Sequence, residues 1–422
     1  VLLGIVFAEP LVELSTNWNG SKELSTEEAR KTKELAVWLF RFFILNVFFY
    51  GIGTIGTGVL NAHRRFFLPT FAPVLNNLVA IACLLGFALL APEHPEAAIY
   101  LLAATTFGVA VMSLVLLPPM HRLGYRLRPV FGHPSLLPAV RLAVPMLVFV
   151  ASGAGVVFVA TLLSTSFFAA PQIGYAFVVF SLPYGVFVIA LETALMPELS
   201  ERHARGDAER YRDTLSFGLR TMAFVIVPAS VGLVALAEPI VGLLYERGNF
   251  LAQDTEVVAN LLVAYSVGLL PFSAYFLLVR AFYSRQNTRT PALLNLGLFL
   301  LYAALAYGLS RVTGVVGVAL AYSAVSAVFA LIGLAAMRKE VGRLGSRLLL
   351  RSGAKILLAG TVMYAFAWGG TTIFGTGSDL LGRAFVVAVV GGTSLAAYLR
   401  AAYLLGSEEL KPAAALLRRR GI

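Results

Sequence analysis

Charged residues are scarce in this chain, and so are the residue types that build metal and disulfide sites. Only 13% of the 422 residues are charged, whereas 59% are hydrophobic. A soluble domain of this length needs more charge to cover its surface, so the composition indicates a membrane protein. The single cysteine, Cys83, excludes an intrachain disulfide, and the five histidines are scattered without metal-ligand spacing. The sequence therefore predicts no metal, haem or other cofactor.

Long apolar runs recur at lengths that suit a hydrocarbon core of about 30 Å, which takes roughly 20 helical residues. Lipid offers no hydrogen-bond partner to free backbone groups, so a chain that crosses a membrane forms helices or a closed β-barrel. The sequence lacks the alternation of apolar and polar residues that is typical of barrel strands, so each run is expected to be a helix. The predicted fold is an all-α, polytopic membrane helical bundle. We expect eleven complete spans: 35–60, 69–91, 97–118, 139–166, 170–198, 212–236, 256–282, 291–310, 312–337, 352–374 and 381–405.

Prolines fall within or at the ends of five of these spans, where they are expected to kink or break the helix. They are Pro73, Pro145, Pro183, Pro228 and Pro271.

Lysine and arginine are distributed unevenly between the two sets of alternate loops. One set, which includes the C-terminal tail, carries 21 basic residues and the other carries 7. Because cytoplasmic loops are enriched in Lys and Arg, the C-terminus is expected in the cytoplasm. This bias accounts for the net charge of +11 without nucleic acid.

Two pairs of segments indicate an internal repeat. Ala8-Glu-Pro-Leu-Val12 matches Ala237-Glu-Pro-Ile-Val241, and the polar turn 61–69 matches 283–291, with offsets of 229 and 222. Both copies keep the same inside–outside sense, which is typical of a parallel repeat. The second copy has two further spans before its Ala-Glu-Pro element. We therefore expect about 90 residues to precede Val1 in a longer protein of 14 spans.

The repeat suggests a division into four parts. Residues 1–118 are expected to be the remainder of an N-terminal lobe, from the end of helix 3 to helix 6, and 119–138 a cytoplasmic linker. Residues 139–337 are expected to form a C-terminal lobe of helices 7–12. Residues 338–422 are expected to add two helices and a basic cytoplasmic tail. Segment 237–248 is predicted as a short interfacial helix, and 408–422 as a basic membrane-surface segment.

Three motifs resemble those of a known family. Segment 58–77 (Gly-Val-Leu-Asn-Ala-His-Arg-Arg-Phe-Phe-Leu-Pro-Thr-Phe-Ala-Pro-Val-Leu-Asn-Asn) resembles the fourth-to-fifth helix signature of the lipid II flippases (MurJ/MviN). Leu182-Pro-Tyr-Gly185 with Ala194-Leu-Met-Pro-Glu-Leu-Ser200 resembles their eighth helix. Segment 281–291 resembles their tenth-to-eleventh helix turn.

The resemblance implies a member of the multidrug/oligosaccharidyl-lipid/polysaccharide exporter superfamily in the bacterial plasma (inner) membrane. Such a protein flips undecaprenyl-pyrophosphate-linked peptidoglycan precursor, lipid II, outward by alternating access between two lobes. Membrane lipids and cell-wall synthesis proteins are the other implied partners. The family's eighth-helix arginine aligns with Val178 and a nearby family glutamate with Ser181, so these substrate contacts are not carried over.

Pyrophosphate requires fixed cations, and arginine suits it through its fork of donors. Arg41 and Arg220 lie within spans, where charges are functional candidates, although snorkelling to the interface is the alternative. Arg141 and Arg280 lie nearer span ends, where snorkelling is favoured. The repeated turns carry a further basic set, which either gathers the headgroup or only sets topology: Arg64, Arg65, Arg285 and Arg289.

Glu192 is the one acid deep within a predicted span. It is a candidate for binding Na⁺, carrying a proton or pairing with an arginine. Asn46 is a candidate for contacting the sugar–peptide headgroup or for bonding between helices. Spans 139–166, 291–310 and 312–337 contain no Asp or Glu, which argues against a carboxylate-rich sodium site and favours the membrane potential as driving force.

The sequence is also compatible with other functions. One is an exporter of another polyprenyl-linked saccharide or amphipathic compound, and another is a non-transporting scaffold. A membrane-embedded enzyme is disfavoured, because the sequence has no cluster of acids or histidines at a membrane face.

Overall fold

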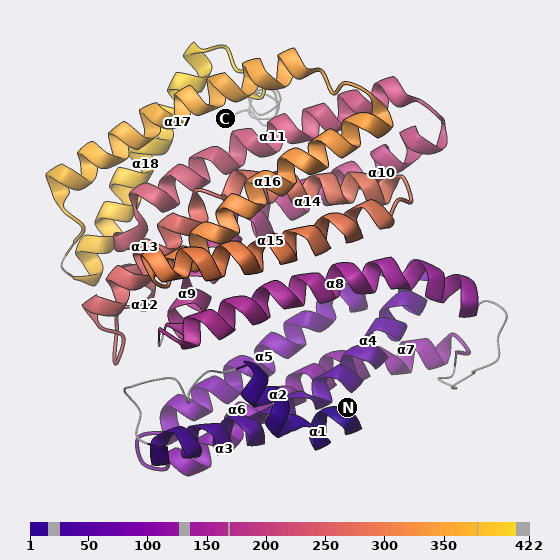
Figure 1. The fold of residues 1–422 in the computed structure, drawn as a ribbon, viewed down its shortest axis with the longest axis vertical. Coiled ribbons are helices and arrows are strands. Elements are labelled where there is room, and N and C mark those ends of the chain that lie inside the picture. Colours follow the sequence, from indigo (N-terminus) through magenta and orange to yellow (C-terminus); the bar gives the residue numbers. More distant parts are fainter. Residues whose placement is uncertain (16–25, 126–135, 168, 378, 411–422) are drawn as a thin grey trace. The chain divides into compact units, whose positions relative to one another are not determined.

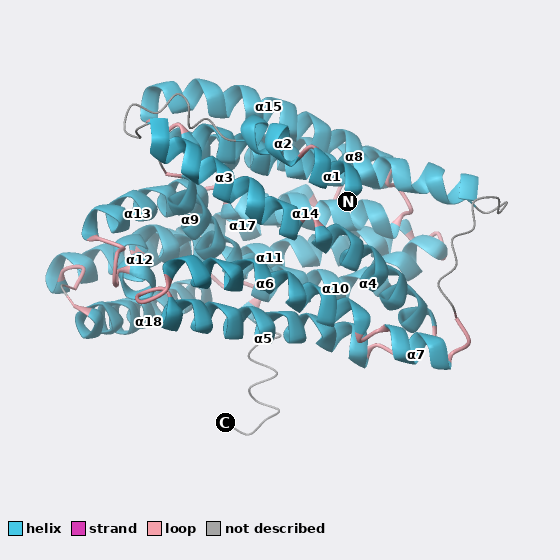
Figure 2. Ribbon diagram, turned by 90° about the horizontal axis from the view of Figure 1, so that it is seen from below, coloured by secondary structure: helices cyan, strands magenta, loops and turns pink. Residues whose placement is uncertain are grey.

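The computed structural model describes residues 1–15, 26–125, 136–167, 169–377 and 379–410. These residues form helices joined by loops and contain no strand, so the predicted all-α fold is confirmed (Figures 1 and 2). The chain divides into two compact units, Val1–Leu136 and Leu137–Ile422.

The described residues of unit 1 form seven helices. They are α1 (Leu2–Val6), α2 (Ala8–Ser15), α3 (Thr26–Phe43), α4 (Leu45–Ala62), α5 (Phe67–Leu90), α6 (Pro95–Leu114) and α7 (Leu117–Arg122). Helix α6 packs against both α4 and α5. A Cβ on Gly53 of α4 would lie 2.8 Å from Oγ of Ser113, and one on Gly56 would lie 2.9 Å from Leu116. Close approach of small residues is how helices associate in lipid, so these glycines hold α4 against α6 and the start of α7.

Unit 2 begins with α8 (Leu136–Thr165) and α9 (Ala170–Pro183). A π-helical turn, Tyr184–Val188, leads into α10 (Ile189–Ala204). The remaining helices are α11 (Ala208–Ala235), α12 (Ala237–Tyr245), α13 (Ala252–Ser266), α14 (Leu269–Ser284), α15 (Arg289–Thr313), α16 (Val316–Val341), α17 (Ser346–Phe374) and α18 (Leu380–Leu404).

Unit 2 is packed around α11, α13, α14 and α16. Large side chains such as Tyr211, Phe180 and Phe282 are fully buried there. Helix α17 lies beside both α18 and α11, which adds the last two helices to the unit (Figure 1).

The described residues contain ten helices that are long and apolar enough to cross a membrane. The helices α13 and α14 together form an eleventh candidate, bent by 50° at residues 267–268. The eleven expected spans therefore agree with the structure, although several run longer than predicted. The first, for example, extends over Arg30–Ala62.

The prolines act differently from site to site. Pro183 ends α9 and is followed by the π-helical turn, and Pro271 lies just after the bend between α13 and α14. The bend beside Pro271 confirms the prediction of a break there, whereas the π-helical turn after Pro183 is a local departure from α-helical geometry within the continuous span Ala170–Ala204. In contrast, α5, α8 and α11 continue as helices through Pro73, Pro145 and Pro228, so no broken turn forms there.

The predicted short helix at 237–248 is α12, and its counterpart in the repeat is the short helix α2. The basic tail lies almost wholly outside the described residues, which end at Leu410.

Candidate functional site

An ion pair joins α10 to α14 within the spans of unit 2. Nε of Arg280 donates to Oε2 of Glu192 at 3.3 Å. The Glu192 side chain is only 3% exposed, whereas that of Arg280 is 53% exposed. Oε1 of Glu192 is buried and accepts no hydrogen bond from any described residue. Of the roles left open for Glu192, the structure shows pairing with an arginine.

The pair has a local origin in the sequence. Glu192 lies in the first turn of α10, directly after the π-helical turn. A π-helical turn inserts an extra residue and rotates the following helix, and such turns are frequent at functional sites. Arg280 was expected to snorkel, but its Nε is instead fixed by a buried carboxylate. Its two terminal nitrogens donate no hydrogen bond to any described residue, and its side chain is 53% exposed.

Arg220 lies in a second ionic cluster, at the junction of α11, α17 and the segment after α18. Its Nη1 lies 3.2 Å from Oε1 of Glu409 and 3.4 Å from Oε2 of Glu408. The side chains of Arg220 and Glu409 are 13% and 4% exposed, and Ser352 donates a further hydrogen bond to Glu409. The charge of Arg220 is thus compensated inside the protein. Its predicted contact with substrate stays a prediction.

Arg285 belongs to a polar cluster around the turn between α14 and α15. Its Nε lies 3.1 Å from Oε2 of Glu340, and its Nη1 donates to Nδ1 of His203 at 3.3 Å. Its guanidinium also lies over the ring of Tyr211, 5.5 Å from the centroid. Arg289, at the first position of α15, is exposed.

The remaining predicted residues lie in unit 1. Arg41 is exposed in the last turn of α3, and Arg64 and Arg65 are exposed in the turn after α4. Asn46, in the first turn of α4, has a buried Oδ1 without a hydrogen-bond partner among the described residues. Among the eight residues predicted as substrate contacts, no two bond to each other in the described part of the chain; the eight are Arg41, Asn46, Arg64, Arg65, Glu192, Arg220, Arg285 and Arg289.

A separate polar cluster ties α12 and α13 to α18. Nη2 of Arg383 donates to Oε1 of Glu246 at 2.7 Å, and the hydroxyl of Thr255 donates to Oε2 at 2.6 Å. These two hydrogen bonds hold the pKa of the Glu246 carboxyl below its usual range.

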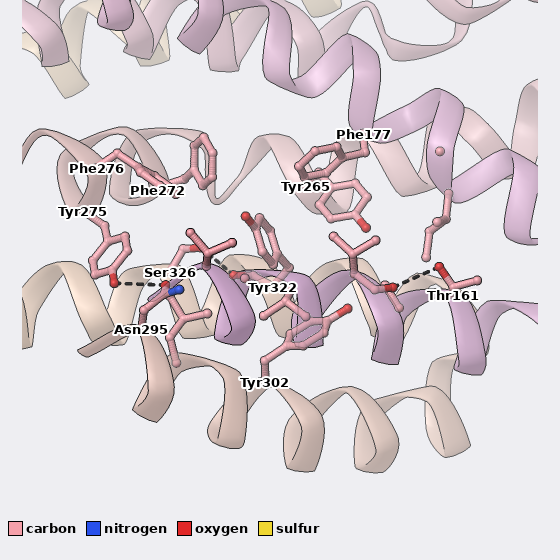
Figure 3. A pocket seen from close by; sticks show the side chains of 18 of the residues that line it. Thr161, Phe177, Tyr265, Phe272, Tyr275, Phe276, Asn295, Tyr302, Tyr322 and Ser326 are labelled. Atoms are coloured by element: carbon pink, nitrogen blue, oxygen red, sulfur yellow. Dashed lines mark hydrogen bonds between the residues drawn. The ribbon is translucent and has the colours of Figure 1, made fainter. Parts of the chain in front are cut away.

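Two cavities were not foreseen from the sequence. The first, which we call the tyrosine pocket, has a volume of about 310 Å³ and lies between α8, α9 and α13–α16 (Figure 3). The one feature of the sequence that could have indicated this pocket is a set of four tyrosines inside apolar spans: Tyr265, Tyr275, Tyr302 and Tyr322. The second, which we call the apolar groove, has a volume of about 520 Å³ and is lined mainly by α11 and α18.

The chain is similar in sequence to known proteins of one family. The chain is 28% identical over 422 residues to a probable lipid II flippase MurJ of Bdellovibrio bacteriovorus, with 97% of this chain and 77% of that protein covered. It is 31% identical to a probable lipid II flippase MurJ of Vibrio cholerae over 61% of this chain. That alignment spans about half of the relative, 49% of its length.

Solved structures share the fold. The structure of a lipid II flippase MurJ in an inward closed conformation gives a TM-score of 0.70 at 21% identity, covering 94% of this chain and 80% of that one. An inward-facing multidrug resistance MATE transporter of the MOP superfamily gives a TM-score of 0.65 at 16% identity. That comparison covers 82% of this chain and 78% of the other. The family model for the lipid II flippase MurJ matches residues 1–383. The chain is therefore a multi-pass membrane protein that belongs to the lipid II flippase MurJ family.

Proposed function

We propose that this protein moves lipid II from the inner to the outer leaflet of a bacterial plasma membrane by alternating access. Family membership and the candidate spans support this role. The excess of basic residues in alternate loops supports a cytoplasmic C-terminus. The expected lobes, 1–118 and 139–337, stay part of the proposal, with 119–138 as the linker between them and 338–422 as two added helices and a tail.

The observation that carries the proposal is the pairing of Arg280 with Glu192. The side chain of Glu192 is only 3% exposed. Its carboxylate needs a cation nearby, because burying an unpaired charge is costly. Because Glu192 engages only Nε, the terminal fork of Arg280 is free to bind a phosphate group through two parallel hydrogen bonds. In this proposal Arg280 contacts the pyrophosphate and Glu192 positions it.

The position of Arg280 also matters for the two positions at which this sequence departs from the family pattern, Val178 and Ser181. Val178 is 54% exposed on α9 and carries no charge, and Ser181 bonds only to the carbonyl of Val178. The family's eighth-helix cation is thus missing from this chain. Arg280, on α14, supplies a cation in the same unit.

The apolar groove suits the polyprenyl tail. Its walls are almost entirely aliphatic and aromatic, with Phe224, Met363 and Leu395 among them, and no charged residue lines it. A chain of isoprene units gains contacts there that are equivalent to those it has in lipid, while the headgroup is held by cations. The groove therefore accommodates a long tail during transport.

Other predicted contacts remain proposals of lower priority. Arg41 and Asn46 in unit 1, and the turn residues Arg64, Arg65 and Arg289, are exposed or lack a partner and so are available to the headgroup. We also propose that the membrane potential drives transport. Cell-wall synthesis proteins are proposed as further partners.

Complementation tests the proposal. The complete gene is expressed in bacteria depleted of their own lipid II flippase, with growth and lipid II accumulation as readouts. We expect Arg280→Ala to lose rescue and Arg280→Lys to retain part of it, because lysine keeps the charge but not the fork. Arg205→Ala is the matched control, since Arg205 is 65% exposed and pairs only with Glu201 one turn away.

A double variant separates binding from folding. In Arg280→Ala alone, Glu192 is left buried without its cation, which destabilises the unit. Adding Glu192→Gln removes that charge and restores membrane expression, but a headgroup contact stays lost. If the double variant rescues growth fully, Arg280 has only a structural role. If the wild-type gene fails despite normal membrane expression, a different lipid-linked substrate or a scaffold role is favoured.

A further inference from the structure

The tyrosine pocket has the size and composition of a small-molecule site. Its volume of about 310 Å³ falls at the lower end of ligand pockets, which hold about 300–1,000 Å³. Side chains from six helices line it, and none of the lining residues is an acid, a lysine, an arginine or a histidine. Its polar groups are hydroxyls and one amide, set among aromatic rings (Figure 3).

The amide of the pocket is already engaged. Asn295 accepts a hydrogen bond from the hydroxyl of Tyr275 at 3.2 Å, and its Nδ2 donates to the backbone carbonyl of Phe149 at 2.7 Å. This pair of bonds fixes Asn295 and connects α8 to α15. The amide is therefore part of the pocket wall, and the recognition chemistry must come from other groups.

Three tyrosine hydroxyls in the pocket have free bonding capacity. The hydroxyls of Tyr265, Tyr302 and Tyr322 form no hydrogen bond with any other described residue, and all three side chains line the pocket (Figure 3). The side chains of Tyr265 and Tyr302 are buried, and that of Tyr322 is half-buried. A molecule that accepts hydrogen bonds can therefore bind to these hydroxyls inside the pocket.

The lining of the tyrosine pocket argues against a cation as the ligand. Tyr265 and Tyr302 both meet Tyr322 in edge-to-face contacts, with centroids 5.8 and 5.9 Å apart, so the three rings form one connected aromatic group. Because no acid lines the pocket, a buried cation there would lack a counter-ion.

We propose that the tyrosine pocket binds an uncharged, ring-bearing molecule that carries a hydrogen-bond acceptor such as a carbonyl. The rings of the pocket pack against the body of the ligand, and tyrosine hydroxyls donate to its acceptor. This site is independent of lipid II transport, whose substrate is anionic.

The pocket also has a route of entry and a structural consequence. Val150 and Val157 of α8 line it and are 64% and 63% exposed, so its α8 side reaches the surface of unit 2. A ligand seated behind them packs between α8 and the helices that carry the tyrosines. Binding therefore adds contacts that hold α8 to the rest of the unit and raises thermal stability.

Photolabelling with benzophenone tests the proposal, because this neutral two-ring ketone also reacts with nearby C–H bonds under light. The full-length protein in nanodiscs is labelled over a range of concentrations, and labelled peptides are mapped by mass spectrometry. We expect saturable labelling of 149–161 and 265–276. Labelling that rises linearly with concentration and is confined to lipid-facing positions would overturn the proposal.

Substitutions define the site. Replacing Tyr265, Tyr302 and Tyr322 by Phe keeps the rings, and we expect half-saturation to require about two- to tenfold more benzophenone for each donating hydroxyl that is lost. Tyr364→Phe is the control, since Tyr364 is 46% exposed on α17, away from the pocket. An unchanged half-saturation in the triple variant contradicts recognition by the hydroxyls.

A filled pocket provides a second test. A Cβ on Gly153 of α8 would lie 3.8 Å from Nδ2 of Asn295, so Gly153→Leu places its side chain in the pocket and should abolish saturable labelling. Gly308→Leu, where a Cβ meets open space, is the control.

Competition then tests the class of ligand. We expect excess camphor, a neutral ketone, to suppress labelling and to raise the thermal midpoint. Suppression by tetraethylammonium or by sodium ions, without an effect of camphor, would assign the pocket to a cation instead and overturn the proposal.

Discussion

Arg64 and Gln286 hold the same left-handed backbone conformation, with φ of 57° and 58°, and they occupy corresponding positions of the repeated turns 61–69 and 283–291. They are the two non-glycine residues with positive φ in the described ranges. The repeat seen in the sequence thus extends to backbone geometry that neither residue type favours by itself.

The hydrogen bonds of the two turns agree as well. The N–H of Arg65 bonds to the carbonyl of Leu60 at 2.9 Å, and that of Asn287 to the carbonyl of Phe282 at 3.0 Å. Each of these hydrogen bonds ends a helix in the same C-terminal motif, in which the residue with the left-handed conformation is usually glycine. Both α4 and α14 therefore end in the same way.

Gln286→Gly is expected to stabilise the protein by about 0.5–1 kcal/mol, because glycine relieves the left-handed strain. Gln286→Ala keeps its Cβ and should give no gain. Thermal unfolding in detergent measures both variants. Equal midpoints for the glycine and alanine variants would show that the turn is not strained.

The pair of Arg220 and Glu409 is expected to fasten the end of α18 to α11. Because both side chains are largely buried, Arg220→Ala or Glu409→Ala alone should cost about 3–5 kcal/mol. The double variant should cost less than the two single changes added together. Faster amide hydrogen exchange of residues 400–410 in these variants would show that the end of α18 has loosened.

The same double variant tests the predicted role of Arg220 in transport. If Arg220 contacts only Glu408 and Glu409, the double variant supports growth once it is expressed at normal levels. A folded double variant that fails to complement would instead place Arg220 in the transport path.

Glu246 should make stability depend on acidity. Its pKa is lowered in the folded protein by hydrogen bonds from Arg383 and Thr255, so it contributes stability above the ordinary carboxyl pKa of about 4.3. That contribution is lost as the pH falls through the ordinary and then the lowered value. Glu246→Gln should therefore lower the unfolding midpoint at pH 7 and have a diminishing effect toward pH 3.

Glu201→Gln serves as the comparison for Glu246. Glu201 is 56% exposed and pairs with Arg205 on the same helix, so its replacement should change the midpoint little at any pH. A deficit of the Glu246 variant that stays constant from pH 7 to pH 3 would contradict the role of its charge.

Gly268 is expected to be required where α13 meets α14. A Cβ there would lie 2.5 Å from Cα of Ser323, a backbone atom of α16 that cannot move aside. Gly268→Ala should force α16 away and break the hydrogen bonds from Ser323 to the carbonyls of Ala264 and Tyr265, lowering both yield and thermal midpoint. Gly308→Ala, in open space, should be neutral or slightly stabilising.

The sequence by itself determined the class of the protein, the candidate spans and the repeat. These depend on local properties: a helix in lipid satisfies its own backbone, so a sufficiently long apolar run is a span wherever its neighbours lie. The π-helical turn after Pro183 and the bend beside Pro271 are local in the same sense. Helices α5, α8 and α11 nevertheless continue through their prolines, because neighbouring structure can satisfy the freed backbone groups.

Only the tertiary structure decided the partners of the charged residues. The sequence favoured Arg220 over Arg280 as a functional candidate, yet Arg280 meets the buried Glu192 with an exposed side chain, whereas Arg220 is largely buried and paired with Glu408 and Glu409. The tyrosine pocket likewise combines residues from six helices. No local pattern encodes such meetings, because they depend on which faces of distant helices pack together and on the cost of leaving a charge or hydroxyl unpaired in lipid.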